Sequence, residues 1–205
     1  MSETQLHRLQ SSGPPPEPIR ILTVSGSLRA RSSNGEALGA AAALAPEGVR
    51  VTPFRGLGGL PAFNPDLDWE GATPPAAVGE LRRLVADADA LLISSPEYAH
   101  GVPGSLKNAL DWLVSDASVV HKPVGVLNLS PRSRHAHEAL GEILRTMSMT
   151  VTPLASVALP PRDGGWTSTT MAQEPELASA FRGALDALCA AVIVHRARRE
   201  QGASL

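Results

Sequence analysis

The sequence predicts an α/β fold, a three-layer sandwich in which helices cover both faces of a five-stranded parallel sheet. Short apolar segments alternate along the chain with segments whose apolar residues recur at helical spacing. A helix between two strands carries the chain back across the sheet, so successive strands run parallel. The 205 residues, 43% of them hydrophobic, are enough to bury such a core.

Five apolar segments are expected to form the strands. They are Ile19–Ser25, Val49–Phe54, Ala90–Ile93, Val124–Leu129 and Val151–Val157. The third is short and wholly apolar, which is typical of a strand that is covered on both faces.

Helical patterns fill the intervals between these strands. Thr73 before Pro74 predicts a helix start, because proline is favoured at the first helical position. The apolar stripes are Leu38, Ala41, Ala42 and Ala45; Val78, Leu81, Leu84, Val85 and Ala88; Leu106, Leu110 and Leu113; and Leu177, Phe181, Leu185, Leu188 and Val192.

Two prolines indicate the strand order. Pro53 falls in the second predicted strand and Pro153 in the fifth. Proline cannot donate to a ladder, so it belongs on edge strands. Strands 2 and 5 are both edges in the order 2-1-3-4-5, whereas strand 2 is interior in the order 3-2-1-4-5-6. The prolines therefore favour the flavodoxin-like order.

The domain boundaries follow from composition. Residues 1–18 contain a Ser-Ser-Gly-Pro-Pro-Pro run and are expected to form a disordered tail. Residues 19–199 are expected to form one domain, followed by a C-terminal tail at 200–205. The last helix is expected to end in three solvated arginines, Arg196, Arg198 and Arg199.

Charge and composition exclude several classes of protein. The formal charge is −2, which argues against a nucleic-acid or polybasic membrane binder. Cys189 is the only cysteine, so an internal disulfide and a cysteine zinc site are excluded, and we expect it in the core. No apolar run approaches the roughly 20 residues of a membrane helix, and the N-terminus lacks an apolar signal core. We expect a cytoplasmic protein with neither a nucleic-acid nor a membrane partner.

The loop after the first strand suits a phosphate. It runs Ser25-Gly26-Ser27-Leu28-Arg29-Ala30-Arg31-Ser32-Ser33-Asn34 and leads into a helix. Backbone N–H groups and the helix dipole favour an anion there, and Arg29 can bind it bidentately. A polar turn that only caps the helix at Ser33 or Asn34 is the simpler alternative. Neither a P-loop nor a dinucleotide G-x-G-x-x-G motif is present.

The loop after the third strand suits a flat ring. It runs from Ser94 to Gly104 with two prolines and two glycines, which fix an irregular backbone that can present N–H and C=O groups. A stiff loop with a capped helix would explain part of it, but not the clustering of Glu97, Tyr98 and His100.

Both loops resemble motifs of the NADPH-dependent FMN reductase family, which includes bacterial quinone, chromate and azo-dye reductases. The family's phosphate motif, G-S-x-R-x-x-S-x-N, is matched by Gly26, Ser27, Arg29, Ser32 and Asn34. Its ring motif, P-E-Y-N-x-x-x-P-G-x-L-K-N-A-I-D-W, is matched by Pro96, Glu97, Tyr98, Pro103, Gly104, Leu106, Lys107, Asn108, Ala109, Asp111 and Trp112. The resemblance covers about residues 19–195 and extends to the stretch Leu60–Leu67.

The resemblance implies an oxidoreductase that passes a hydride from NADPH through bound FMN to a quinone, a flavin or a similar flat acceptor, by a ping-pong mechanism. It implies FMN contacts from Ser25, Gly26, Ser27, Arg29, Ser32, Ser33, Asn34, Pro96, Glu97, Tyr98, Ala99, His100, Gly101 and Ser130. No side-chain acid or base is strictly required for the first half of the reaction, the reduction of the flavin. In the second half, His100 is a candidate proton donor to a reduced quinone, and water is the alternative.

The resemblance also implies a homodimer or homotetramer with the flavin site near the subunit contact. Phe63, Trp69 and Trp112 lie in or near segments that could meet a partner, although Trp112 suits the core equally well.

The sequence departs from the family pattern at two places. The asparagine that follows the tyrosine in the family is Ala99 here. The loop after the fourth strand, often glycine-rich in the family, carries Arg132 and Arg134. We hypothesise that these arginines bind the phosphates of NADPH; solvated surface arginines are the alternative. His135 and His137 are two residues apart, which is poor metal-ligand spacing, so no metal site is expected.

Two other functions share the predicted fold. A flavodoxin-like electron carrier would have a T-x-T-G-x-T phosphate loop and a strongly acidic surface, and this chain has neither. A sensor that binds flavin without turnover stays open. Three further points also stay open: the physiological acceptor, the choice between NADPH and NADH, and the choice between dimer and tetramer.

Overall fold

The structure is a computed structural model that describes residues 17–130, 134–154, 159–160 and 165–202. Its strands are β1 (Ile19–Ser25), β2 (Val49–Phe54), β3 (Ala90–Ser94), β4 (Pro123–Leu127) and β5 (Thr150–Thr152). All neighbouring strands pair in parallel, in the order β2-β1-β3-β4-β5. The predicted fold class and strand order are therefore confirmed.

Two predicted strands end early. β4 stops at Leu127 rather than at residue 129, because the Asn128 side chain accepts a hydrogen bond from Ser130 N–H (3.0 Å) and turns the chain. β5 stops at Thr152, so Pro153 follows the strand instead of lying within it, while Pro53 does lie in edge strand β2. Residues 155–157 of the predicted fifth strand lie outside the described residues.

The helices are α2 (Ser33–Ala43), α3 (Ala76–Asp87), α4 (Gly104–Asp111), α5 (Arg134–Thr146), α6 (Ser168–Gln173) and α7 (Pro175–Gly202), with short 3₁₀ turns η1 (Leu57–Gly59), η2 (Pro65–Leu67) and η3 (Ala117–Val119). α3 begins two residues after the predicted start, because extended Pro75 is its N-cap. α2 ends before Ala45, which packs against the core from outside the helix.

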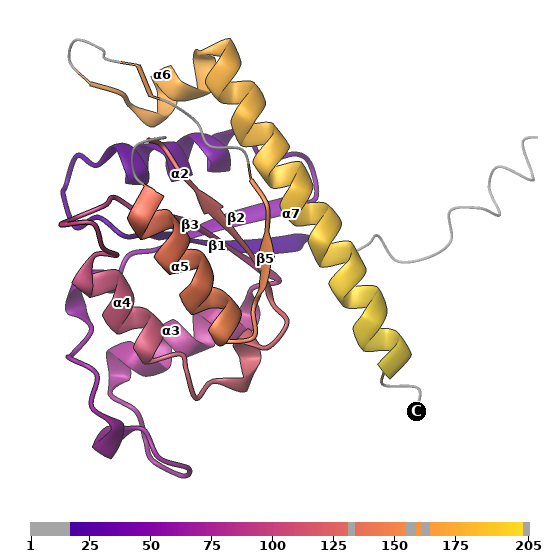
Figure 1. Ribbon diagram of the computed structural model, residues 1–205. Helices are drawn as coiled ribbons and strands as arrows, with labels where there is room; N and C mark the ends of the chain where they lie inside the picture. The colour runs from indigo at the N-terminus through magenta and orange to yellow at the C-terminus, as the bar shows by residue number, and fades with distance from the viewer. Residues whose placement is uncertain (1–16, 131–133, 155–158, 161–164, 203–205) are drawn as a thin grey trace, which may run out of the picture.

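The core has one layer on each face of the sheet (Figure 1). β3 supplies both layers in alternation: Leu91 and Ile93 pack with α3, α4 and α5, and Ala90 and Leu92 pack with α2, α6 and α7. All five predicted apolar residues of the last helix are buried: Leu177, Phe181, Leu185, Leu188 and Val192. Cys189 is only half-buried, and burial raises the pKa of its thiol.

Helix α7 corrects two predictions: that no apolar run approaches the length of a membrane helix, and that residues 200–205 form a tail. The segment Pro175–Gln201 is long and apolar enough to cross a membrane, and 39% of its most apolar stretch is buried. Since its core residues pack on the sheet, we interpret α7 as a core helix of the domain. Residues 200–202 belong to this helix rather than to a tail; residues 1–16 and 203–205 lie outside the described part of the chain.

Arg196 is not a solvated helix end. Its guanidinium lies 2.8 Å from the Asp89 carboxylate and also donates hydrogen bonds to the backbone carbonyls of Glu17 and Pro18, 3.2 and 3.3 Å away. The last helix is thereby joined to the segment that enters β1.

Candidate functional site

The site lies at the carboxyl ends of β1 and β3, the point where the strand order reverses. Ser25 and Ser94, the last residues of these strands, are register partners. The two predicted loops begin immediately after them, and the first turn of α5 lies beside the second loop. This is the edge of an open α/β sheet where ligands bind.

Hydroxyl groups shape the loop between β1 and α2. Ser25 Oγ accepts a hydrogen bond from Ser27 N–H (3.3 Å), and Ser27 Oγ accepts one from Arg29 N–H (3.4 Å). Ser32, which is buried, is the N-cap of α2 and accepts from Gly35 N–H. The cap is therefore one residue before Ser33. The loop is pre-formed, and the helix N-terminus faces the end of the sheet.

Gly26 is required by a close approach between the two loops. A Cβ atom at this position would lie 2.4 Å from Ser95 Oγ and 3.1 Å from Leu106 Cδ2. Gly26 N–H also donates to the Ser94 carbonyl (2.8 Å). The first loop therefore packs directly on the start of the second.

Asn34 is bound to the sheet rather than free. The fully buried hydroxyl of Ser94 lies 2.8 Å from Asn34 Oδ1 and 3.1 Å from the Leu127 carbonyl, and its single proton is shared between these two oxygens. One hydroxyl thus joins the first turn of α2 to β3 and β4, and Asn34 positions the helix N-terminus.

A cavity of about 420 Å³ opens beside the first loop. Four predicted phosphate-loop residues line it: Ser25, Ser27, Arg29 and Ser32. Arg55 directly after β2 and Ser168 at the start of α6 also line it, and sequence reasoning missed both. Glu36 lines it too, and its carboxylate accepts hydrogen bonds from the backbone N–H and the hydroxyl of Ser168 (2.6 and 2.7 Å). The position of Arg55 directly after an edge strand was the available signal. No residue of 96–101 lines this cavity.

The second loop contains a tight turn. Tyr98 and Gly101 exchange two backbone hydrogen bonds (3.1 and 2.9 Å), and the residues between them, Ala99 and His100, have φ of 48° and 60°. Two successive positive φ values define a type I′ turn, which favours asparagine and glycine. Alanine in place of the family's asparagine therefore carries backbone strain. Tyr98 is 52% exposed at the edge of this turn.

Two side chains of this loop contact α5. Glu97 Oε2 accepts a hydrogen bond from Ala136 N–H (2.8 Å), in the first turn of the helix. The His100 ring stacks on the His135 ring, with centroids 4.4 Å apart and planes 22° apart. Glu97 and His100 therefore hold the second loop against α5.

The remaining predicted positions are dispersed. Ser33 is exposed, and Arg134 is exposed at the first residue of α5. Ser130 donates its N–H to Asn128, and Arg132 lies outside the described residues. In the described part of the chain, no group of three or more His, Cys, Asp or Glu side chains could hold a metal ion.

The later part of the ring motif supports the segment after η1. The Asn108 side chain accepts a hydrogen bond from Phe63 N–H (2.7 Å) and donates one to the Pro61 carbonyl (2.9 Å). Trp112 Nε1–H donates to the same Pro61 carbonyl (2.9 Å). The rings of Phe63 and Trp112 meet edge to face at 5.0 Å. Trp112 is fully buried, so of the two placements left open for it, the core is the one observed.

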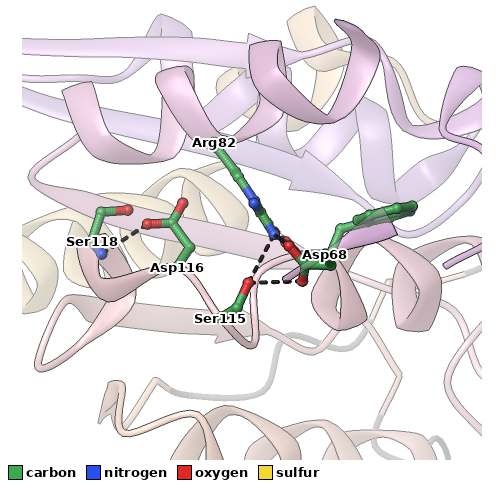
Figure 2. Close-up of polar contacts among 6 residues, drawn as sticks. Asp68, Arg82, Ser115, Asp116 and Ser118 are labelled. Carbon is green, nitrogen blue, oxygen red and sulfur yellow. Dashed lines mark hydrogen bonds and ion pairs between the residues drawn. The ribbon is translucent and has the colours of Figure 1, made fainter. Parts of the chain in front are cut away.

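An ion pair fixes the next part of that segment (Figure 2). Arg82 lies 2.7 Å from Asp68, and Ser115 donates to the same carboxylate (2.7 Å). Arg82 also donates to the Trp112 carbonyl. Burial acts to raise the pKa of Asp68, but the hydrogen bonds from Arg82 and Ser115 and the charge of Arg82 lower it overall.

A sequence model of the family described as NADPH-dependent FMN reductase matches residues 19–163. The chain belongs to this family. The predicted family is therefore confirmed, and FMN and NADPH, which its description names, agree with the predicted cofactor and co-substrate.

Curated relatives of this chain include reductases from three bacteria. A quinone reductase of Escherichia coli K12 is 36% identical over 53% of this chain and 58% of its own length. An NAD(P)H-dependent FMN reductase of Pseudomonas aeruginosa (42% identical) and a 2-hydroxy-1,4-benzoquinone reductase of Burkholderia (43%) each match over 46% of this chain and 49% of their own length. The chain spans about half the length of the curated relatives it matches.

A solved structure shows the same fold over more of the chain. The NAD(P)H:acceptor oxidoreductase FerB of Paracoccus denitrificans superposes with a TM-score of 0.74 and 24% identity, over 86% of this chain and 98% of that one.

Proposed function

We propose that this protein is an NAD(P)H-dependent, FMN-containing reductase that acts on a quinone or a similar flat acceptor. The observation that carries the proposal is the cavity in which Arg29 and three serines meet at the carboxyl ends of the strands, in a chain of this family. The names of the relatives, quinone reductase and 2-hydroxy-1,4-benzoquinone reductase, support the acceptor class.

The residues present fit the phosphate end of FMN. The cavity offers the Arg29 guanidinium, serine hydroxyls and the N-terminus of α2 to an anion. Gly26 lets this loop pack directly on the start of the second loop. The turn from Tyr98 to Gly101 is the support proposed for the ring. When bound, FMN accepts a hydride from NADPH and delivers reducing equivalents to the acceptor.

The chain's own residues orient the reactants. The Glu97–Ala136 contact and the His100–His135 stack keep the second loop at a fixed distance from α5. NADPH and the acceptor would then occupy one face of the site in turn, as a ping-pong mechanism requires. Arg134 and Arg132 are proposed to bind the NADPH phosphates; an unchanged KM for NADPH in Arg132→Ala/Arg134→Ala, with Arg182→Ala as control, would reject this role.

His100 is proposed to supply a proton to the reduced acceptor. Its ring is exposed, and the stack on His135 fixes its position. His100→Ala should lower the rate of quinone reduction and change its pH dependence, while His121→Ala, at the other end of the sheet, should not. A quinone rate unchanged at every pH in His100→Ala would reject the role.

The first experiment is a visible spectrum of the purified protein, repeated without oxygen after adding NADPH. A bound flavin spectrum that bleaches within seconds is expected, followed by return of the colour on adding a benzoquinone. Arg29→Ala should weaken FMN binding, and Arg50→Ala, on the outer strand β2, should not. Flavin that binds but is not reduced would indicate a carrier or a sensor, and no flavin uptake would limit the family inference to the fold.

We also propose that the protein is a cytoplasmic homo-oligomer. Leu67, Trp69 and Val114 have exposed apolar side chains and are sequence neighbours of Asp68 and Ser115. Arg82 holds Asp68 and Ser115 together (Figure 2). Exposed apolar side chains of this kind suit a subunit contact. Trp69→Glu should yield monomers in sedimentation; a wild-type protein that is monomeric and retains FMN would exclude a site completed by the partner.

A further inference from the structure

A larger groove lies at the opposite edge of the sheet from the cofactor cavity. It has a volume of about 590 Å³, within the range of small-molecule sites, and lies between the amino ends of β4 and β5 and the C-terminal half of α7. β4 alone spans roughly 17 Å between the two edges. The groove is therefore separate from the proposed FMN site.

The floor of the groove is apolar. Buried Pro123 at the start of β4 and half-buried Ala191 on α7 form it, with Ala190 and the side chain of Val194, which is 51% exposed. These small side chains leave room for an aliphatic group against the helix. An apolar body would remove Val194 and its neighbours from water.

The rim of the groove carries two arginines and two histidines. His121, His195, Arg198 and Arg199 line it. Lys122 lies buried beside them, and its ammonium donates to the Ala88 carbonyl. The whole chain has a formal charge of −2, so this concentration of positive groups is local.

Two carboxylates at this end of the fold are already engaged. Asp89 pairs with Arg196 and Arg20 at 2.8 and 3.5 Å, and Asp116 accepts from Ser118 N–H. Arg198 and Arg199 are both exposed and line the groove. Two guanidinium groups are thus placed where an anion in the groove would meet them.

The surroundings of His195 disfavour its protonated form. Burial lowers the pKa of His195, and the charges of Arg199, Lys122 and His121 lower it further, against a weaker opposing effect of Asp89. An anion in the groove would act in the opposite direction to those charges.

We propose that this groove binds a small organic anion with an apolar body, such as an aliphatic carboxylate or sulfonate. Arg198, Arg199 and His195 bind the anionic head by charge-assisted hydrogen bonds, and the floor beside Val194 binds the aliphatic body. The charge of the rim selects an anion over a neutral or cationic amphiphile, and the volume selects a small molecule.

Calorimetry with the FMN-loaded full chain tests the proposal. The probes are decanoate, decanol, decyltrimethylammonium and inorganic phosphate, each below its aggregation concentration. Decanoate should bind at least about tenfold more tightly than the other three. Equal binding of decanol or of phosphate would overturn the proposal, because the site would then recognise only apolar surface or only charge.

Variants locate the binding. Arg198→Gln/Arg199→Gln and Val194→Asp should each weaken decanoate binding about tenfold, and Arg182→Gln, an exposed site on the same helix, should not. Decanoate should raise the pKa of His195 in wild-type NMR titrations and not in Val194→Asp. Unchanged affinity in both groove variants, binding only to anionic vesicles, or loss of the groove in a dimer seen by sedimentation would each overturn it.

Discussion

The carboxylate of Glu97 lies 2.8 Å from the backbone nitrogen of Ala136 and accepts its hydrogen bond. The first turn of a helix has N–H groups without intrahelical partners, and its dipole favours negative charge. Glu97 therefore caps α5 from a loop 39 residues earlier in the chain. It ties the loop that is proposed to support the flavin ring to the first turn of α5.

Removing this cap should destabilise the protein. Glu97→Ala is expected to lower the free energy of unfolding by about 1 kcal/mol, and Glu97→Gln by less, because its amide oxygen still accepts a hydrogen bond. Urea unfolding measures both. Glu138→Ala, at an exposed position of the same helix, is the control, and an equal loss in that variant would contradict a capping role.

The strained turn offers a stabilising substitution. Ala99 has a φ of 48°, so Ala99→Asn or Ala99→Gly should raise the free energy of unfolding by about 0.5 to 1 kcal/mol. Ala139→Gly, at an exposed position inside α5, should lower it by about 1 kcal/mol. A loss of stability in both Ala99 variants would mean that the alanine makes contacts outweighing the strain.

The close approach at Gly26 predicts a severe effect of one methyl group. Gly26→Ala would place Cβ 2.4 Å from Ser95 Oγ, so it should destabilise the protein and weaken FMN binding. Adding Ser95→Gly should recover part of both. Gly35→Ala, where the nearest atoms are 3.9 Å away, is the control for stability. Thermal unfolding measures the stability of the variants, and flavin titration measures their affinity for FMN. A Gly26→Ala variant as stable as Gly35→Ala would contradict the prediction.

The Asp68–Arg82 pair predicts a pH-dependent stability. The pKa of Asp68 is lower in the folded protein than its ordinary value of 3.8. The ionised carboxylate therefore contributes to the free energy of unfolding above pH 3.8, and this contribution is lost as the pH falls through the folded pKa. Asp68→Asn should cost about 1 to 2 kcal/mol at pH 7, and the difference from wild type should shrink below pH 4. A difference that is equal at pH 7 and pH 3 would contradict this.

The fold was predictable because its signals are local. Apolar periodicity and the edge position of Pro53 were sufficient for the sheet and its order. The end of β4 was not predictable in this way, because it depends on a turn made by Asn128. Likewise, the start of α3 depends on whether Thr73 or Pro75 is the N-cap, which spacing alone does not decide.

The sequence indicated which residues gather at the candidate site but not which partners they bind. The predicted phosphate loop includes Ser25, Ser27, Arg29 and Ser32, and these four residues line one cavity. The sequence did not show that Glu97 caps α5 or that Asn34 binds Ser94, because both contacts cross between distant segments. Arg55 was missed because it belongs to no motif and reaches the cavity only through the position of β2.

The contacts of Arg196 bear on the order in which the chain acquires its structure. Its hydrogen bonds to Glu17 and Pro18 join residues separated by 179 and 178 positions in the sequence. Pairings of such separation form late, because a long loop must close before they contribute. During synthesis on the ribosome, the hydrogen bonds of Glu17 and Pro18 can therefore form only after the C-terminal part of α7, which carries Arg196, has been made.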